Sequence, residues 1–138
     1  MRRPEKLVET QIRHAAHEWG WSLDVYDSAV LIVAGKKIKK GGLQVGSPDM
    51  MGASDSGIAL YIELKKPDHN NICRIEQRLF LERKIESNAF GVVTDSPEHL
   101  LATYRKWLSL RGDLKAARDY LLSCLPKKVL VKGKVVSL

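Results

Sequence analysis

The chain has 138 residues, of which 44% are hydrophobic and 28% charged, so its composition excludes a disordered polypeptide and is typical of one folded domain. Twenty-three Lys and Arg residues against sixteen Asp and Glu residues leave a net charge of +7, which favours a polyanionic partner such as nucleic acid. No apolar run approaches the ~20 residues that a membrane span needs, and no signal peptide is recognisable, so we expect a soluble, cytoplasmic protein without a membrane partner.

The first helix is predicted from Pro4 to Trp19, because proline favours a first helical turn and Gly20 ends the pattern. The apolar residues at helical spacing are Val8, Ile12, Ala15, Ala16 and Trp19. Glu9 lies beside this stripe. Taken alone, Glu9 is best explained as part of a solvated face, where it would pair with Arg13 one turn later.

One or two strands are predicted from Trp21 to Val33, with a turn at Asp27 and Ser28. The next segment, Gly35 to Gly42, has glycines at both ends and is predicted to be a loop. Its lysines are Lys36, Lys37, Lys39 and Lys40. A charge run is often merely solvated, but the position of this one favours contact with DNA phosphates, which would hold a substrate without reading its sequence.

A buried strand is predicted from Ile58 to Leu64, where an apolar run is interrupted by Glu63 and followed by Lys65. Because side chains alternate along a strand, Glu63 and Lys65 should share one face. Asp49 follows Pro48 in a glycine-flanked turn, and a hairpin-like return would bring Asp49 beside Glu63. The two charges at the strand end could also be a simple salt bridge, with Asp49 only a turn residue.

Two neighbouring carboxylates repel each other and are costly to bury unless a cation lies between them. Oxygen ligands of this kind suit Mg²⁺ or Mn²⁺, and the backbone carbonyl of Leu64 could be a further ligand. Lys65 could then hold an attacking water or a phosphate oxygen. These charges point to hydrolysis of a phosphodiester.

The second half of the chain predicts three helices and three strands. A helix should run from an N-cap within Asp68 to Asn71 up to about Glu86, followed by a buried strand from Ala89 to Thr94. A further helix should begin at Ser96-Pro97 and reach Leu110. The inward residues expected in these two helices are Ile72, Ile75, Leu79, Phe80 and Ile85, then Leu100, Leu101, Tyr104 and Leu108.

The tail predicts another helix before Pro126 and two short strands that turn at Lys132-Gly133. Its apolar residues could pack on the domain itself or form a homodimer interface. Cys73 and Cys124 are expected to be reduced thiols in helices, and their spacing does not support a zinc site. The order of elements predicts an α/β fold with helices around a mixed sheet.

The combination of Pro48-Asp49 with Glu63-Leu64-Lys65 resembles the PD-(D/E)XK nuclease superfamily. The wider pattern of G-S-P-D, I-E-L-K, a helix with Gln77 and the strand AFGVVTDS is similar to its VRR-NUC branch, from about Glu9 to about Trp107. The resemblance implies a restriction-endonuclease-like core in residues 1–110, extended within the same domain by residues 111–138. It also implies a phage-type, stand-alone enzyme.

The resemblance assigns roles to five side chains and one carbonyl. It implies a Mg²⁺ or Mn²⁺ ion held by Asp49, Glu63 and the Leu64 carbonyl, with an outer contribution from Glu9 through water. It also implies that Lys65, with help from Gln77, positions the attacking water. The expected substrate is branched or structured DNA such as a Holliday junction, and the expected assembly is a homodimer.

Three alternatives stay open at this point. The chain could be a flap or single-strand nuclease, or a DNA-binding module that keeps the fold without catalysis. A structural or assembly protein is a further alternative, but it would leave Asp49, Glu63 and Lys65 without a purpose.

Overall fold

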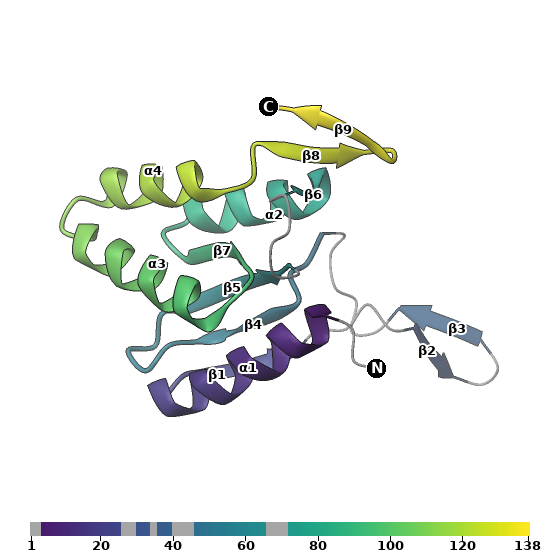
Figure 1. Cartoon of the computed structure of the whole chain (residues 1–138), viewed down its shortest axis with the longest axis horizontal. Helices are drawn as coiled ribbons and strands as arrows, with labels where there is room; N and C mark the ends of the chain where they lie inside the picture. Colours follow the sequence, from purple (N-terminus) through teal and green to yellow (C-terminus); the bar gives the residue numbers. More distant parts are fainter. Residues whose placement is uncertain (1–3, 26–29, 34–35, 40–45, 66–71) are drawn as a thin grey trace.

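The computed structural model describes residues 4–25, 30–33, 36–39, 46–65 and 72–138 (Figure 1). These ranges contain α1 (Pro4–Trp19), β1 (Ser22–Val25), β2 (Val30–Val33), β3 (Lys36–Lys39), β4 (Met50–Ala53), β5 (Ala59–Leu64), β6 (Ile72–Arg74), α2 (Ile75–Glu86), β7 (Phe90–Thr94), α3 (Pro97–Leu110), α4 (Leu114–Cys124), β8 (Lys128–Val131) and β9 (Lys134–Ser137). Within these ranges, no helix combines the length and the apolar character needed to cross a membrane.

A four-stranded sheet in the order β1-β4-β5-β7 forms the centre of the fold. The β1–β4 and β4–β5 pairs are antiparallel, whereas β5 and β7 are parallel, so the sheet is mixed. The carboxyl ends of β5 and β7 therefore meet at one edge of the sheet.

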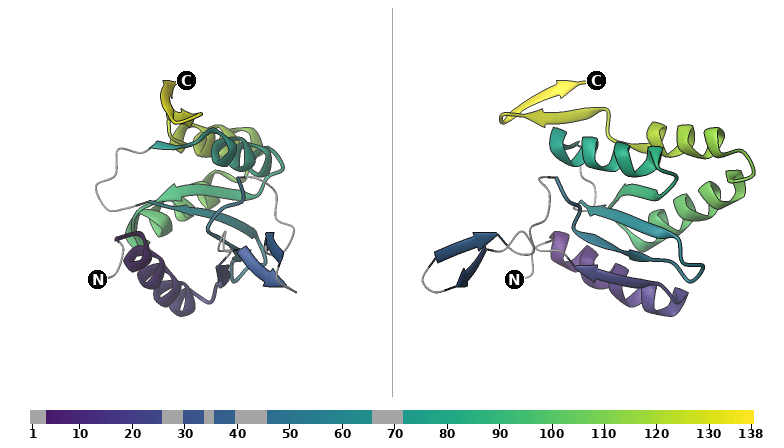
Figure 2. Two further views of the ribbon diagram at one scale, coloured as in Figure 1. Left: turned by 90° about the vertical axis from the view of Figure 1, so that its right-hand side faces the viewer. Right: turned by 180° about the vertical axis from the view of Figure 1, so that it is seen from behind.

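Helices cover both faces of this sheet (Figures 1 and 2). On one face, Phe90 of β7 contacts Tyr104 and Trp107 of α3, and α1 lies beside α3. On the other face, Tyr61 of β5 contacts Phe80 of α2 with ring centroids 5.9 Å apart. The predicted α/β class with a mixed sheet is confirmed.

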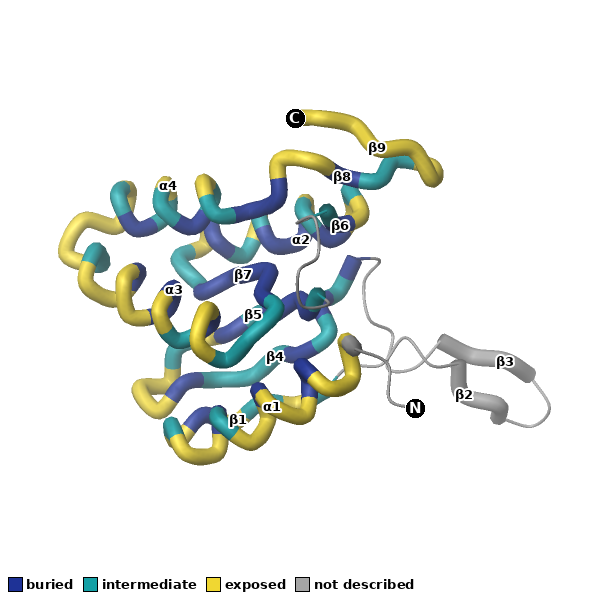
Figure 3. Tube along the Cα trace, viewed as in Figure 1, coloured by how far each residue is buried: buried dark blue, intermediate teal, exposed yellow. Residues whose placement is uncertain are grey.

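The alternation along β5 decides which residues meet which helices. Leu60 is paired with Phe90, so Leu60, Ile62 and Leu64 belong to the face covered by α1 and α3. Tyr61 and Glu63 belong to the face covered by α2. Figure 3 shows that β7 is buried along its whole length, although it is the last strand of the sheet.

The first helix is confirmed with its predicted boundaries. Val8, Ile12 and Ala16 are buried against the sheet. Gly20 has φ of +76°, and the N–H of Trp21 donates to the carbonyl of Ala16 at 2.9 Å, as in a Schellman motif that ends a helix.

The predicted lysine loop is wrong over its described part. Lys36–Lys39 form β3, which pairs antiparallel with Val30–Val33. β2 is rich in β-branched residues, which favour strands, and all four of its residues pair with Lys36–Lys39. This strand pairing outweighs the preference of the lysines for a loop. Gly35, Lys40 and the predicted turn at Asp27 and Ser28 lie outside the described residues.

The helix after the site stretch begins later than predicted. Ile72–Arg74 form β6, which pairs in parallel with β8, and α2 starts only at Ile75. The expected N-cap run, 68–71, lies outside the described residues. Leu79 is 45% exposed, and the buried residues of α2 are Gln77, Phe80, Leu81 and Ile85.

The Ser96 cap of α3 is confirmed, since its side chain accepts a hydrogen bond from the N–H of His99 at 3.1 Å. Leu108, predicted to face inward, is 38% exposed, and Trp107 takes its place in the core. Trp107 contacts Phe90 with ring centroids 5.4 Å apart, so the side of α3 that faces the sheet includes position 107 rather than 108.

The tail forms the predicted helix and hairpin. Lys132 and Gly133 both have positive φ, as a two-residue hairpin turn requires. β8 packs on the domain through β6 and α2, whereas β9 is exposed. Cys124 ends α4 as predicted, but Cys73 lies in β6 rather than in a helix; both are free thiols.

Candidate active site

Asp49 is placed by the turn that leads into β4. Gly46 has φ of +88°, and a Cβ there would clash with the carbonyl oxygen of Glu76, so the turn lies directly against the first turn of α2. Met50 then pairs with Ile62. One step further in this register, Asp49 comes opposite Glu63, and opposite residues of an antiparallel pair share a face.

The Asp49 carboxylate is fixed to the end of β5. Its Oδ2 accepts a hydrogen bond from the backbone N–H of Leu64 at 2.8 Å. In an extended strand the N–H and C=O of one residue point to the same neighbour. The carbonyl of Leu64 therefore points to the side on which Asp49 lies, as the predicted ligand set requires.

Glu63 is the most unusual group in the site. Its side chain is only 2% exposed, and its Oε2 has no hydrogen-bond partner among the described residues. Burial, and then the adjacent Asp49 carboxylate, raise the pKa of Glu63 to about 10, although the charges of Lys65 and Arg74 act in the opposite direction. Without a cation, Glu63 therefore holds a proton at neutral pH.

Lys65 lies at the mouth of this pair. Its backbone N–H donates to the carbonyl of Thr94 at 2.9 Å, which ties the end of β5 to the end of β7. By alternation its side chain shares the face of Glu63, and it is partly exposed. The Lys65 ammonium group is thus accessible to solvent next to the buried Glu63 and the half-buried Asp49.

Gln77 is the residue that the resemblance assigns to help Lys65. It is buried, and its Oε1 accepts a hydrogen bond from the N–H of Arg74 at 2.9 Å, which caps the first turn of α2. The bond uses only the carbonyl oxygen of the side chain and leaves the amide N–H groups as donors.

Arg74 is the site residue that the sequence did not reveal. It is exposed at the start of α2, and its charge acts on Glu63. The sequence around Arg74 does not predict its position, because Arg74 lies in β6. This strand forms only through its pairing with the distant β8.

Glu9 is not brought to the same face as the carboxylate pair. It is buried on α1, on the side of Leu60 and Ile62, and pairs with Lys6 at 2.7 Å. The described residues contain no cluster of three or more His, Cys, Asp or Glu side chains that could hold a metal. The outer role of Glu9 stays a prediction.

The predicted DNA contacts of Lys36, Lys37 and Lys39 depend on side chains beyond the described part of the structure, and Lys40 lies outside it altogether. These contacts also stay predictions.

The groups that the structure does assemble fit a hard divalent cation. They are two carboxylates and one carbonyl at the end of β5, with a buried carboxylate oxygen that lacks a partner among the described residues. Mg²⁺ and Mn²⁺ prefer oxygen ligands and keep several waters, so a small protein ligand set suits them.

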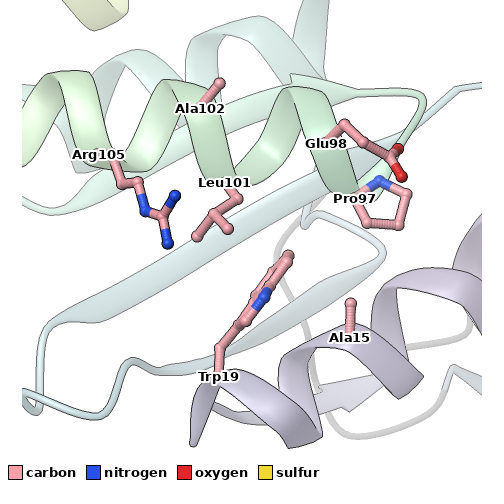
Figure 4. A pocket seen from close by; sticks show the side chains of 7 residues that line it. All are labelled: Ala15, Trp19, Pro97, Glu98, Leu101, Ala102 and Arg105. Carbon is pink, nitrogen blue, oxygen red and sulfur yellow. The ribbon is translucent and has the colours of Figure 1, made fainter.

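A separate pocket of about 280 Å³ lies between α1 and α3 (Figure 4). Trp19 and Leu101 form its apolar wall, and Arg105 and Glu98 line its ends. It opens on the helix face opposite the carboxylate pair and contains none of the site residues.

A scan against protein-family models and searches of curated proteins and of solved structures found no match to this chain.

Proposed function

We propose that this chain is a metal-dependent endonuclease of the VRR-NUC type, with a restriction-endonuclease-like core, that hydrolyses phosphodiester bonds in structured DNA. The observation that carries the proposal is the buried Glu63 carboxyl, placed beside Asp49 with an oxygen that no described protein group satisfies. Such a pair is costly in a merely structural role. It becomes favourable when a cation binds it.

Asp49, Glu63 and the Leu64 carbonyl are the residues that would hold Mg²⁺ or Mn²⁺. Bound there, the ion would neutralise negative charge that develops on the phosphate during attack. Lys65, partly exposed beside the pair, would hold the attacking water or a phosphate oxygen in line. Arg74 would bind a neighbouring phosphate oxygen, a task that suits the guanidinium group.

The net charge of +7 supports a nucleic-acid substrate, and a Holliday junction or similar branched DNA is the form we propose. A homodimer would place two such sites on two strands of a junction. This assembly is part of the proposal.

The test is a cleavage assay with labelled four-way junction, flap, duplex and single-stranded DNA, each with Mg²⁺, Mn²⁺ or EDTA. The variants are Asp49→Asn, Glu63→Gln and Lys65→Met, which change charge with little change in shape. Asp119→Asn is the matched control, because Asp119 is an exposed carboxylate on α4 that only pairs with Lys115.

We expect cutting that needs the metal, is lost in the three site variants and persists in the control. Symmetric cuts in the junction would support the dimer. Intact DNA in every lane, with binding retained, would refute the nuclease and favour a non-catalytic DNA-binding module.

A further inference from the structure

The last segment of the chain is one of two lysine-rich segments that contain no acidic residue, the other being Gly35 to Gly42. Residues 126–138 contain four lysines and no acidic residue, against a net charge of +7 for the whole chain. These lysines are Lys127, Lys128, Lys132 and Lys134. Three of these lysines, Lys128, Lys132 and Lys134, belong to the β8–β9 hairpin, and Lys127 directly precedes it.

All four lysines are exposed, and none pairs with a carboxylate in the part of the chain that the structure describes. Elsewhere, Lys6, Arg78 and Lys115 each pair with a neighbouring acid. An unpaired group of like charges repels itself, so it costs stability unless a polyanion binds it.

The hairpin is held firmly despite its exposure. Val129 is fully buried, β8 pairs with β6, and the N–H of Leu138 donates to the carbonyl of Lys127 at 2.7 Å. The guanidinium of Arg78 in α2 donates to the carbonyl of Pro126. The lysines are therefore carried by a scaffold that is fixed to the helix beside the active site.

The tip of the hairpin faces the same side of the molecule as the carboxyl end of β5. In Figure 1 the β5 and β8 arrows both point to the right, and in the right-hand view of Figure 2 both point to the left, with the hairpin tip extending further than the end of β5. Arg74 pairs with Leu130 in the β6–β8 register. Lys132 lies two residues beyond Leu130, about 7 Å further in the strand direction, a span that matches roughly two nucleotide steps measured along the DNA helix axis.

We infer that the β8–β9 hairpin is a second DNA-contact surface, which binds backbone phosphates of the duplex that flanks the scissile bond. Its contacts begin at Arg74 and continue to Lys132 and Lys134 at the tip. The inference rests on the proposed function for its choice of partner. It adds an element that the active-site residues do not include.

The test measures DNA binding in EDTA, where no cleavage occurs, so it does not depend on the nuclease being active. Binding of a labelled 20-base-pair duplex is followed by fluorescence anisotropy at several KCl concentrations. The test variant is Lys132→Gln with Lys134→Gln. The control is Lys106→Gln with Lys115→Gln, at the α3–α4 end of the molecule, because both doubles lower the net charge by the same amount.

Loss of two phosphate contacts should reduce the slope of log K against log salt by about 1.8, and the affinity by up to about 60-fold at 0.1 M salt. We expect this loss in the hairpin double and less than half of it in the control. Lys132→Arg with Lys134→Arg keeps the charge and should bind as the wild type does. Circular dichroism checks that each variant is folded.

Equal effects of the two Gln doubles, or a loss of binding in the Arg double, would overturn the hairpin surface. The proposed function fails separately. If DNA is bound through the hairpin but never cut with Mg²⁺ or Mn²⁺, the contact surface is supported and the nuclease is refuted. If the hairpin double binds DNA as the wild type does and the wild type cuts DNA, the nuclease is supported and the contact surface is refuted.

Discussion

Replacing Glu63 with glutamine should stabilise the metal-free protein at neutral pH. The folded state holds a proton on this carboxyl because its pKa is raised from 4.5 to about 10, chiefly by burial. The unfolded chain releases that proton above pH 4.5. The wild type therefore loses stability as the pH rises from 4.5 toward 10, whereas a glutamine has no proton to lose.

The size of the effect follows from the proton difference. Each pH unit between 4.5 and the folded pKa lowers the free energy of unfolding of the wild type by about 1.4 kcal/mol. At pH 7 the difference between the variant and the wild type should be about 3 kcal/mol larger than at pH 4.5. The figure is the same for any folded pKa above 7, so it does not depend on the height of the shift.

Urea denaturation in EDTA at pH 4.5, 7 and 8.5 measures this difference directly. The side-chain amide in the Glu63→Gln variant can donate to Asp49, much as the protonated Glu63 does, so the packing should be kept. Addition of Mn²⁺ at pH 7 should then stabilise the wild type but not the variant. A difference that is independent of pH, or that shrinks as pH rises, would refute the buried, protonated state of Glu63.

Four further outcomes are expected. Stabilisation of the wild type by Mn²⁺ should increase from pH 6 to pH 9 in thermal melts, because the cation competes with the proton on Glu63. Gly46→Ala should lower the free energy of unfolding by more than about 1 kcal/mol and also slow cleavage, since its Cβ would push the Asp49 turn off α2. Gln77→Ala should lower the free energy of unfolding by about 1 kcal/mol, because it removes the cap of α2. Gln77→Glu should keep the stability measured in urea but lose cleavage. Wild-type cleavage rates in the Glu variant would exclude a role for the amide. Trp107→Ala should cost about 3–5 kcal/mol but Leu108→Ala only about 0.5 kcal/mol, and equal costs would contradict the assignment of Trp107 to the core.

The carboxylate pair could be predicted from the sequence because its determinants are local. Asp49 directly precedes β4 and Glu63 lies on β5, the two strands of one hairpin, so a turn and an apolar strand suffice to bring them together. The capped α3 and the C-terminal hairpin were also predictable, because Ser96-Pro97 and Lys132-Gly133 carry their own conformational signals.

What the sequence did not reveal depends on contacts between distant segments. β6 exists because it pairs with β8, more than fifty residues later. This pairing keeps Ile72–Arg74 extended, so α2 begins only at Ile75. The start of α2 and the position of Arg74 could not be predicted without it. Similarly, Leu79 and Leu108 have the right character for a core, but the side of each helix that packs against the sheet decides which residues are buried.

The two faces of the central sheet have different roles: one stabilises the fold and the other carries the carboxylate pair. The face under α1 and α3 is apolar and aromatic, with Tyr104 and Trp107 packed on Phe90, and it contributes stability. The face under α2 carries Glu63, whose burial costs stability in the absence of a cation. The hydrogen bonds of Asp49 to Leu64 and of Lys65 to Thr94 tie this costly end of β5 to both neighbouring strands. Because the same strand is paired on both sides, the core on one face can hold the carboxylates in place on the other, and substitutions on the two faces should therefore separate stability from activity.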